Sequence, residues 1–237
     1  AAAGFARVAD FRAKTLGANA PETVKARQEQ AGALLDAADP KQALALAQSA
    51  LRDAAALPPS DPSRSLLRLD EAEAISALGD RPRARKLLER LRGDSLELRG
   101  EGDPATMDVT NNLAILLGRM GEPKAGRDLL EKLVPLRIRI LGKDDTDTLS
   151  SLHNLAIMRI MTGDKDGAVA LQRGLVETQV RRLGAEHPQT LAERGNLSNM
   201  LVDSDKAKQA LPNATAVLDA DIRVLGGDHT QTIRDKL

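Results

Sequence analysis

A period of 42 residues constrains what this chain can fold into more than any other feature of its sequence. Leu141 opens the string LGKDDTDTL, Leu183 opens LGAEHPQTL and Leu225 opens LGGDHTQTI. The same period sets the spacing of four threonines, which are Thr106, Thr148, Thr190 and Thr232. A regular repeat of this length is typical of a stacked array, because one small unit cannot bury its apolar face alone.

Each repeat is predicted to form two helices. Apolar residues recur at helical spacing on both sides of the break Gly121-Glu122-Pro123. The glycine of this break recurs at Gly79 and Gly163. We therefore expect a single solenoid over residues 1–237. Its predicted segments are a partial unit at 1–15, repeats at about 16–57, 58–98, 99–140, 141–182 and 183–224, and a partial unit at 225–237.

The string that joins two repeats has the residues of a helix end followed by a helix start. Gly184 is expected to end one helix with a positive φ, and Pro188 to take the first position of the next helix. His187 is expected to cap that helix, at the position that an aspartate takes in other repeats. The Thr190 hydroxyl is expected to bond backbone groups of the first turn. A metal or catalytic role for His187 is disfavoured, because no Cys, second His or carboxylate cluster is in helical phase with it.

Composition excludes several classes of function. The chain has two Phe, no Trp and no Tyr, so it cannot stack single-stranded bases on aromatic rings. Lys and Arg together equal Asp and Glu, at 34 each, so we expect no nucleic-acid or membrane partner. Because Cys is absent and no cofactor, metal or catalytic motif occurs, we expect no cofactor, no metal and no enzyme. We also expect a cytoplasmic location.

The repeat resembles the tetratricopeptide repeat of the kinesin-light-chain type. The resemblance lies in the 42-residue unit, the LG-x-x-H-P-x-T junction, the Asn-Leu-Ala of the first helix and the glycine between helices. It implies an all-α fold, an α-solenoid that is a right-handed superhelix of stacked antiparallel helix pairs. Because the sequence has no initiator Met and its end units lack clear caps, we expect a fragment of a larger multidomain protein, and the richness in Ala, Arg, Asp and Gly without Cys suggests a bacterial one.

Small residues are expected where the two helices of a repeat cross. Those of the first helices are Ala72, Ala114, Ala156 and Ser198, and those of the second helices are Ala84, Gly126, Ala168 and Ala210. The opposite face of the first helices would then line a concave groove. Its candidate partner-binding residues are Asn111, Asn112, His153, Asn154, Asn196 and Asn199.

The resemblance implies a non-catalytic module that binds a protein or an extended peptide in this groove, as the sensing or recruitment part of a larger signalling protein. Asn suits that role, because its amide offers donors and an acceptor to a peptide backbone. The same asparagines fit a structural role between neighbouring helices equally well. The alternative function is therefore a structural scaffold or spacer without a peptide ligand, which could self-associate through uncapped ends.

Overall fold

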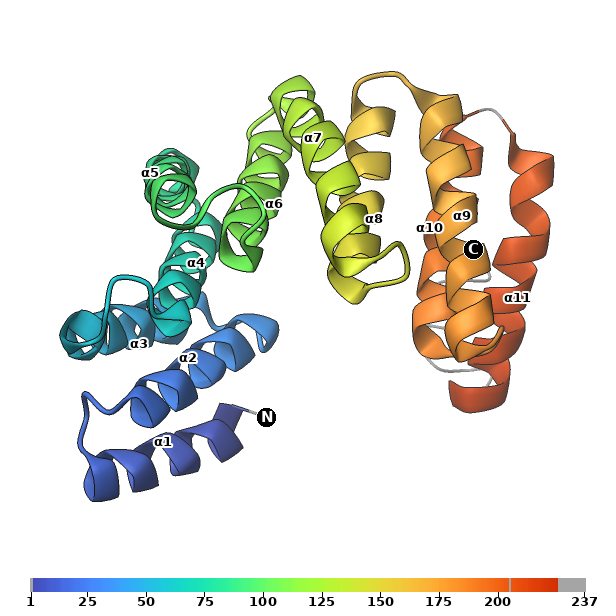
Figure 1. Cartoon of the computed structure of the whole chain (residues 1–237). Helices are drawn as coiled ribbons and strands as arrows, with labels where there is room; N and C mark the ends of the chain where they lie inside the picture. Colours follow the sequence, from blue (N-terminus) through green and yellow to red (C-terminus); the bar gives the residue numbers. More distant parts are fainter. Residues whose placement is uncertain (1, 205, 226–237) are drawn as a thin grey trace. The chain divides into compact units, whose positions relative to one another are not determined.

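A computed structural model describes residues 2–204 and 206–225, and all regular structure in these residues is helical (Figure 1). The all-α class is confirmed. Each predicted repeat holds two α-helices of 14 to 19 residues. The helices are α1 Ala2–Leu16, α2 Pro21–Asp36, α3 Pro40–Asp53, α4 Pro62–Ala77, α5 Arg81–Arg99, α6 Pro104–Arg119, α7 Pro123–Leu141, α8 Thr146–Met161, α9 Lys165–Leu183, α10 Pro188–Asp203 and α11 Ala207–Leu225, with a short 3-10 turn at Ala54–Ala56.

The chain forms two compact units, Ala1–Glu122 and Pro123–Leu237. In the first unit each helix from α1 to α6 packs on its neighbour in the chain, and α4 also packs on α2 and α6. In the second unit α7 to α11 pack in the same consecutive order. Packing of each helix on its chain neighbours is the contact pattern of an α-solenoid, which confirms this architecture within the units. The single solenoid over residues 1–237 and its repeat boundaries stay a prediction.

The junctions between repeats have the predicted capping. The N–H of Gln189 donates to Nδ1 of His187 over 3.2 Å, and the N–H of Ala105 donates to Oδ1 of Asp103 over 3.0 Å. Gly184 ends α9 with a φ of 96°, a conformation that glycine adopts at little cost. His187 is thus a helix cap, as its position in the repeat predicts.

The prediction for Thr190 is wrong. Its side chain is fully buried, and its hydroxyl has no hydrogen-bond partner among the described residues; the same holds for Thr106 and Thr148. Thr23, at the matching position of the first repeat, donates to a junction carbonyl, that of Gly17 at 2.9 Å. In the three later repeats the threonine therefore packs below the junction without using its hydroxyl. Thr232 and the cap position His229 lie outside the described residues.

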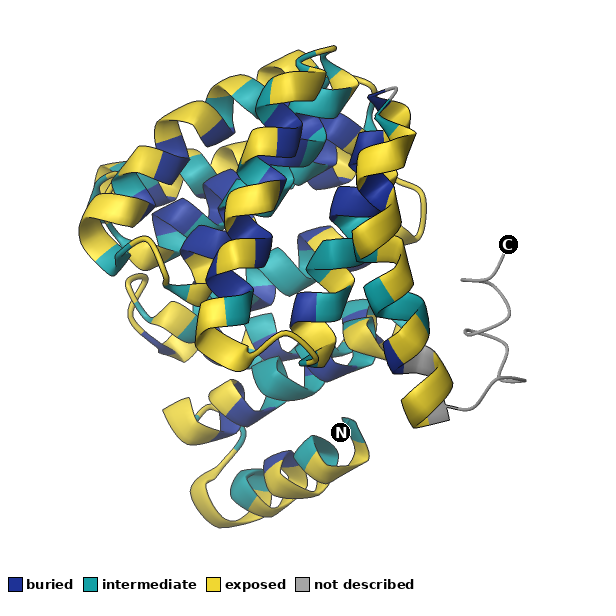
Figure 2. Cartoon of the chain, turned by 90° about the vertical axis from the view of Figure 1, so that its right-hand side faces the viewer, coloured by how far each residue is buried: buried dark blue, intermediate teal, exposed yellow. Residues whose placement is uncertain are grey.

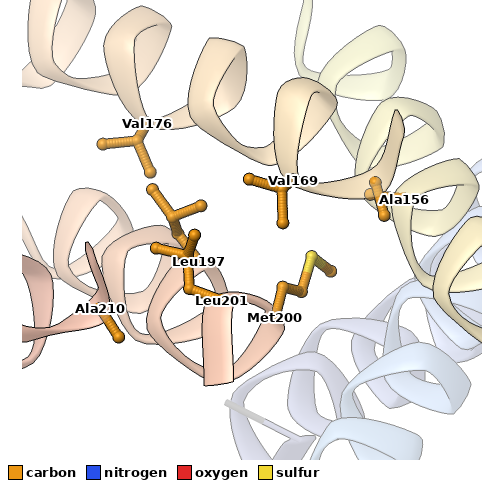
Figure 3. Packing of buried hydrophobic residues seen from close by; sticks show 8 residues of the cluster. Ala156, Val169, Val176, Leu197, Met200, Leu201 and Ala210 are labelled. Carbon is orange, nitrogen blue, oxygen red and sulfur yellow. The ribbon is translucent and has the colours of Figure 1, made fainter. Parts of the chain in front are cut away.

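The core of the second unit forms where α8, α9, α10 and α11 meet (Figure 3). Val176 and Leu197 point toward each other across α9 and α10 (Figure 3). Along the helices, buried segments alternate with exposed ones (Figure 2). Ala156 and Ala168 are completely buried in this cluster. The Ser198 hydroxyl donates to the carbonyl of Ala210 over 3.4 Å, so small residues do lie at this helix crossing.

Replacing Ala156 with Leu should destabilise the fold by about 1–3 kcal/mol, because the added carbons have no space at the crossing. Chemical denaturation of the variant measures this loss. Ala170→Leu, at an exposed position of α9, is the matched control and should change stability little. An Ala156→Leu variant as stable as the wild type would contradict the close packing of these helices.

Ala38 takes the place that a glycine has in later repeats. It lies between α2 and α3 with a φ of +57°, whereas Gly79 and Gly163 have φ values of +98° and +86° at the equivalent breaks. An L-residue with a side chain pays about 1–2 kcal/mol for this left-handed region. The first repeat therefore contains a strained turn. Asp205, at the corresponding break of the last repeat, lies outside the described residues.

Ala38→Gly should stabilise the protein by about 1 kcal/mol, since glycine relieves this strain. The reverse exchange, Gly79→Ala, should destabilise it by a similar amount, although an added Cβ there meets no atom within 4 Å. Equilibrium unfolding of both variants measures the pair of opposite shifts. Equal signs for the two changes would show that backbone conformation does not control stability at these turns.

Candidate functional site

A cavity of about 290 Å³ lies between the first helices α8 and α10 and the end of α9, within the second unit. We call it the α8–α10 pocket. Its polar lining comes from three helices, with Ser150 and His153 on α8, Gln179 and Arg182 on α9, and Gln189 and Glu193 on α10. Because two successive first helices contribute to it, the pocket is on the face that the sequence predicts to bind a partner.

Glu193 is the centre of a polar cluster at the wall of this pocket. Nε2 of Gln172 donates to the Glu193 carboxylate over 2.5 Å and to its backbone carbonyl over 3.0 Å. Nδ2 of Asn196 lies 3.4 Å from the same carboxylate, and Nδ1 of His153 lies 3.4 Å from it as an ion-pair contact. These contacts fix the carboxylate and hold α8, α9 and α10 together.

The cluster favours opposite charges on His153 and Glu193. The nearby Glu193 carboxylate raises the pKa of His153 above its usual 6.5, although burial acts in the other direction. Burial would raise the pKa of Glu193, but the contacts with His153 and Gln172 outweigh burial and lower this pKa. Both shifts favour the charged forms of the two side chains and therefore an ion pair across the pocket wall.

Gln179 is a lining residue of the pocket and carries a buried acceptor. Its side chain is only 9% exposed, and Oε1 has no hydrogen-bond partner among the described residues. A buried amide oxygen without a partner is costly, so it favours a ligand that brings an N–H group. The backbone of an extended peptide supplies such groups.

The six predicted site residues fall into different environments. In the second unit, His153 and Asn196 both contact the carboxylate of Glu193. Asn154 is half-buried and Asn199 is exposed. In the first unit Asn111 is buried. Nδ2 of Asn112 donates to the carbonyl of Asp108, one turn earlier in the same helix, over 3.0 Å. Residues at one repeat position therefore make different bonds in different repeats.

The same repeat position is occupied by Asp70 in the second repeat, and its bonding partner comes from the first repeat. Nε2 of Gln28 on α2 donates to Oδ2 of Asp70 on α4 over 3.1 Å. Burial raises the pKa of Asp70 to about 7; the hydrogen bond from Gln28 opposes this shift, and the charges of Glu73 and Asp36 add to it. In this part of the chain the position links two adjacent first helices.

Asp70→Asn should stabilise the protein by about 2–4 kcal/mol at pH 8, because the variant no longer buries a carboxylate. A raised pKa means that the native state binds the proton more tightly than the unfolded state. The wild type therefore loses stability as pH rises from about 4 to above 7, and the advantage of the variant should vanish below pH 4. Unfolding curves between pH 3.5 and 8 measure this, with exposed Glu97→Gln, whose charge does not contribute to the pKa shift of Asp70, as the control. A pH-independent difference would contradict the raised pKa.

Sequence reasoning missed Glu193, Gln172 and Gln179. One signal was present for Gln172, because it follows Leu88 and Leu130 at the 42-residue period, and both leucines are buried. A polar residue at a core position indicates a local partner. Glu193 has no such signal, since the equivalent residues Ser151 and Val109 share no chemistry with it.

The described residues contain neither a candidate metal-binding cluster nor a candidate membrane-spanning helix. Residues 2–204 and 206–225 contain no group of three or more His, Cys, Asp or Glu side chains placed to hold a metal ion. No described helix has both the length and the apolar character needed to cross a membrane.

Comparison with known proteins agrees with the helical geometry. Residues 105–177 match the tetratricopeptide repeat family. A kinesin-light-chain-like protein of Podosopora anserina with nearly identical TPR-like repeats is 23% identical, with 86% of this chain and 97% of that chain covered and a TM-score of 0.70. BtubC (BKLC) of P. vanneervenii is 16% identical, with 96% and 92% covered and a TM-score of 0.74. No curated protein sequence matches the chain significantly.

A third similar structure is PlcR of Bacillus thuringiensis, solved with the peptide PapR7 and DNA. It is 13% identical, with 90% of this chain and 74% of that chain covered and a TM-score of 0.68. Residues 105–177 are thus tetratricopeptide repeats, and the fold is the α-solenoid of such repeats, which generally serves protein–protein interaction. In fold the chain is similar to the kinesin-light-chain-like proteins.

Proposed function

We propose that this chain is a non-catalytic module that binds an extended peptide segment of a partner protein on its first-helix face, with the α8–α10 pocket as the main contact. The observation that carries the proposal is the unpartnered Oε1 of Gln179 in a pocket lined by two first helices. A role in sensing or recruitment within a larger signalling protein follows from this proposal.

The lining of the pocket suits a peptide better than a small metabolite. Gln179 offers an acceptor for a backbone N–H, and the side chains of Ser150 and Gln189 offer further hydrogen bonds. His153 and Glu193 contact each other, and Arg182 is the remaining charged side chain of the lining, so it can donate a hydrogen bond to a carbonyl or carboxylate oxygen of the peptide. Asn154 and Asn199, which belong to the same unit, would extend the contact along α8 and α10. The peptide that crystallised with PlcR, a protein of similar fold, supports this type of ligand.

Peptides selected from a random display library against this chain test the proposal. We expect affinities on the order of micromolar. Gln179→Ala should weaken a selected peptide about tenfold, since the peptide loses a hydrogen bond. Glu177→Ala changes an exposed residue of the same helix that is not in the lining, so it should leave the affinity unchanged.

Two further results would decide against the pocket. Selected peptides that bind Gln179→Ala and His153→Ala as tightly as the wild type would place the binding surface elsewhere. Failure to select any peptide, together with a sedimentation coefficient that rises with protein concentration, would favour the self-associating scaffold instead.

A further inference from the structure

A second cavity, of about 220 Å³, lies between α4 and α5 in the first unit. Neither Asp70 nor Asn112 lines this cavity, and the cavity belongs to a different unit from the α8–α10 pocket. Its lining combines apolar walls, including Leu91 and Leu98, with a polar end. The proposed peptide-binding function makes no use of this cavity.

The polar end of the cavity has an excess of positive charge. Three arginines line it, Arg64, Arg68 and Arg99, against one carboxylate, Asp94. Nη1 of Arg68 lies 3.6 Å from Oδ2 of Asp94, a loose ion pair at the surface. The lining therefore has two more cationic than anionic side chains.

The other two guanidinium groups are oriented by mostly neutral partners. Nη1 of Arg64 donates to the carbonyl of Leu57 over 2.8 Å. Arg99 donates to the carbonyl of Ser60 over 3.1 Å and to the hydroxyl of Ser65 over 2.5 Å, while its Nε lies 3.6 Å from Asp103. Carbonyl and hydroxyl oxygens hold both groups in place. Asp103 offsets part of the charge of Arg99, whereas the Arg64 guanidinium bonds a neutral carbonyl, so its charge remains available to an anion.

Ser95 adds a buried donor to the same cavity. Its side chain is 1% exposed, and its hydroxyl has no hydrogen-bond partner among the described residues. The equivalent residues of the next two repeats are Arg137 and Gln179, so this repeat has a small residue where those two have long ones. A buried hydroxyl beside three guanidinium groups fits an acceptor ligand with negative charge.

We propose that the α4–α5 cavity binds a phosphate-sized oxyanion. Arginine side chains present paired N–H donors that match the oxygens of a phosphoryl group, and the Ser95 hydroxyl adds a donor. The cavity volume leaves room for such a group and for the atom that carries it. The phosphoryl group comes either from free phosphate or from a phosphorylated side chain of a peptide, and both present the same chemistry to the arginines.

Inorganic phosphate titrated into the ¹⁵N-labelled chain at constant ionic strength tests the proposal. We expect amide shift changes concentrated in α4 and α5, and about tenfold weaker binding in Arg68→Ala. Ser95→Ala should weaken binding without removing charge. Arg90→Ala removes the same charge from an exposed position of α5 outside the lining and should bind like the wild type. Circular dichroism verifies that each variant is folded.

The absence of amide shift changes in α4 and α5 would overturn the proposal. An equal loss of binding in Arg90→Ala and Arg68→Ala would also overturn it, because general charge attraction would then explain the binding. A peptide with one phosphoserine, compared with its unphosphorylated form, distinguishes the source of the anion. Tighter binding than inorganic phosphate assigns the cavity to a phosphorylated partner, whereas equal affinity assigns it to the free ion. Peptide binding at the α8–α10 pocket is measured with different variants, so either proposal can fail alone.

Discussion

The structure depends on the close crossing of two helices through small side chains. At Ala156, Ala168, Ser198 and Ala210 the helices of the second unit approach so closely that a serine hydroxyl bonds the facing backbone. This approach lets leucines and valines interdigitate on either side, and it compensates for a core with almost no aromatic residues. Each helix pair still leaves an apolar face uncovered, which the next helix in the chain covers. Stacking is therefore a consequence of how little one pair can bury.

The first-helix face is where the repeats stop being equivalent. Gln28 and Asp70 bond each other across α2 and α4, Asn112 bonds its own helix, and Asn196 contacts the carboxylate of Glu193. A repeat position keeps the backbone direction of a side chain but does not determine its partners, because these come from the neighbouring repeats. In such a chain, binding sites are best sought where a residue differs from its equivalents in other repeats. Gln172 is a polar residue at a position that is apolar in other repeats, and Ser95 is a small residue at a position where the next two repeats have long side chains.

The two proposed binding regions use different physical chemistry. The α8–α10 pocket combines a buried acceptor on Gln179 with the His153–Glu193 contact and Arg182, so it suits the N–H and carbonyl groups of a peptide backbone. The α4–α5 cavity combines a buried hydroxyl with three arginines against one carboxylate, so it favours an anion. Both features arise at the equivalent position of a second helix, Gln179 in one repeat and Ser95 in another. One position of the repeat can thus be adapted to opposite ligands.

The amino-acid sequence alone determined the helical class, the 42-residue unit, the caps at Asp103 and His187, and the small residues at the crossings. These are local properties, because capping and helix spacing depend on residues a few positions apart. The tertiary structure alone decided that Glu193 joins His153 to Asn196, that Thr190 packs without using its hydroxyl, and that Gln179 and Ser95 face cavities. These properties depend on distances between residues that are far apart in the chain, and a repeat period specifies position but not which side chains meet.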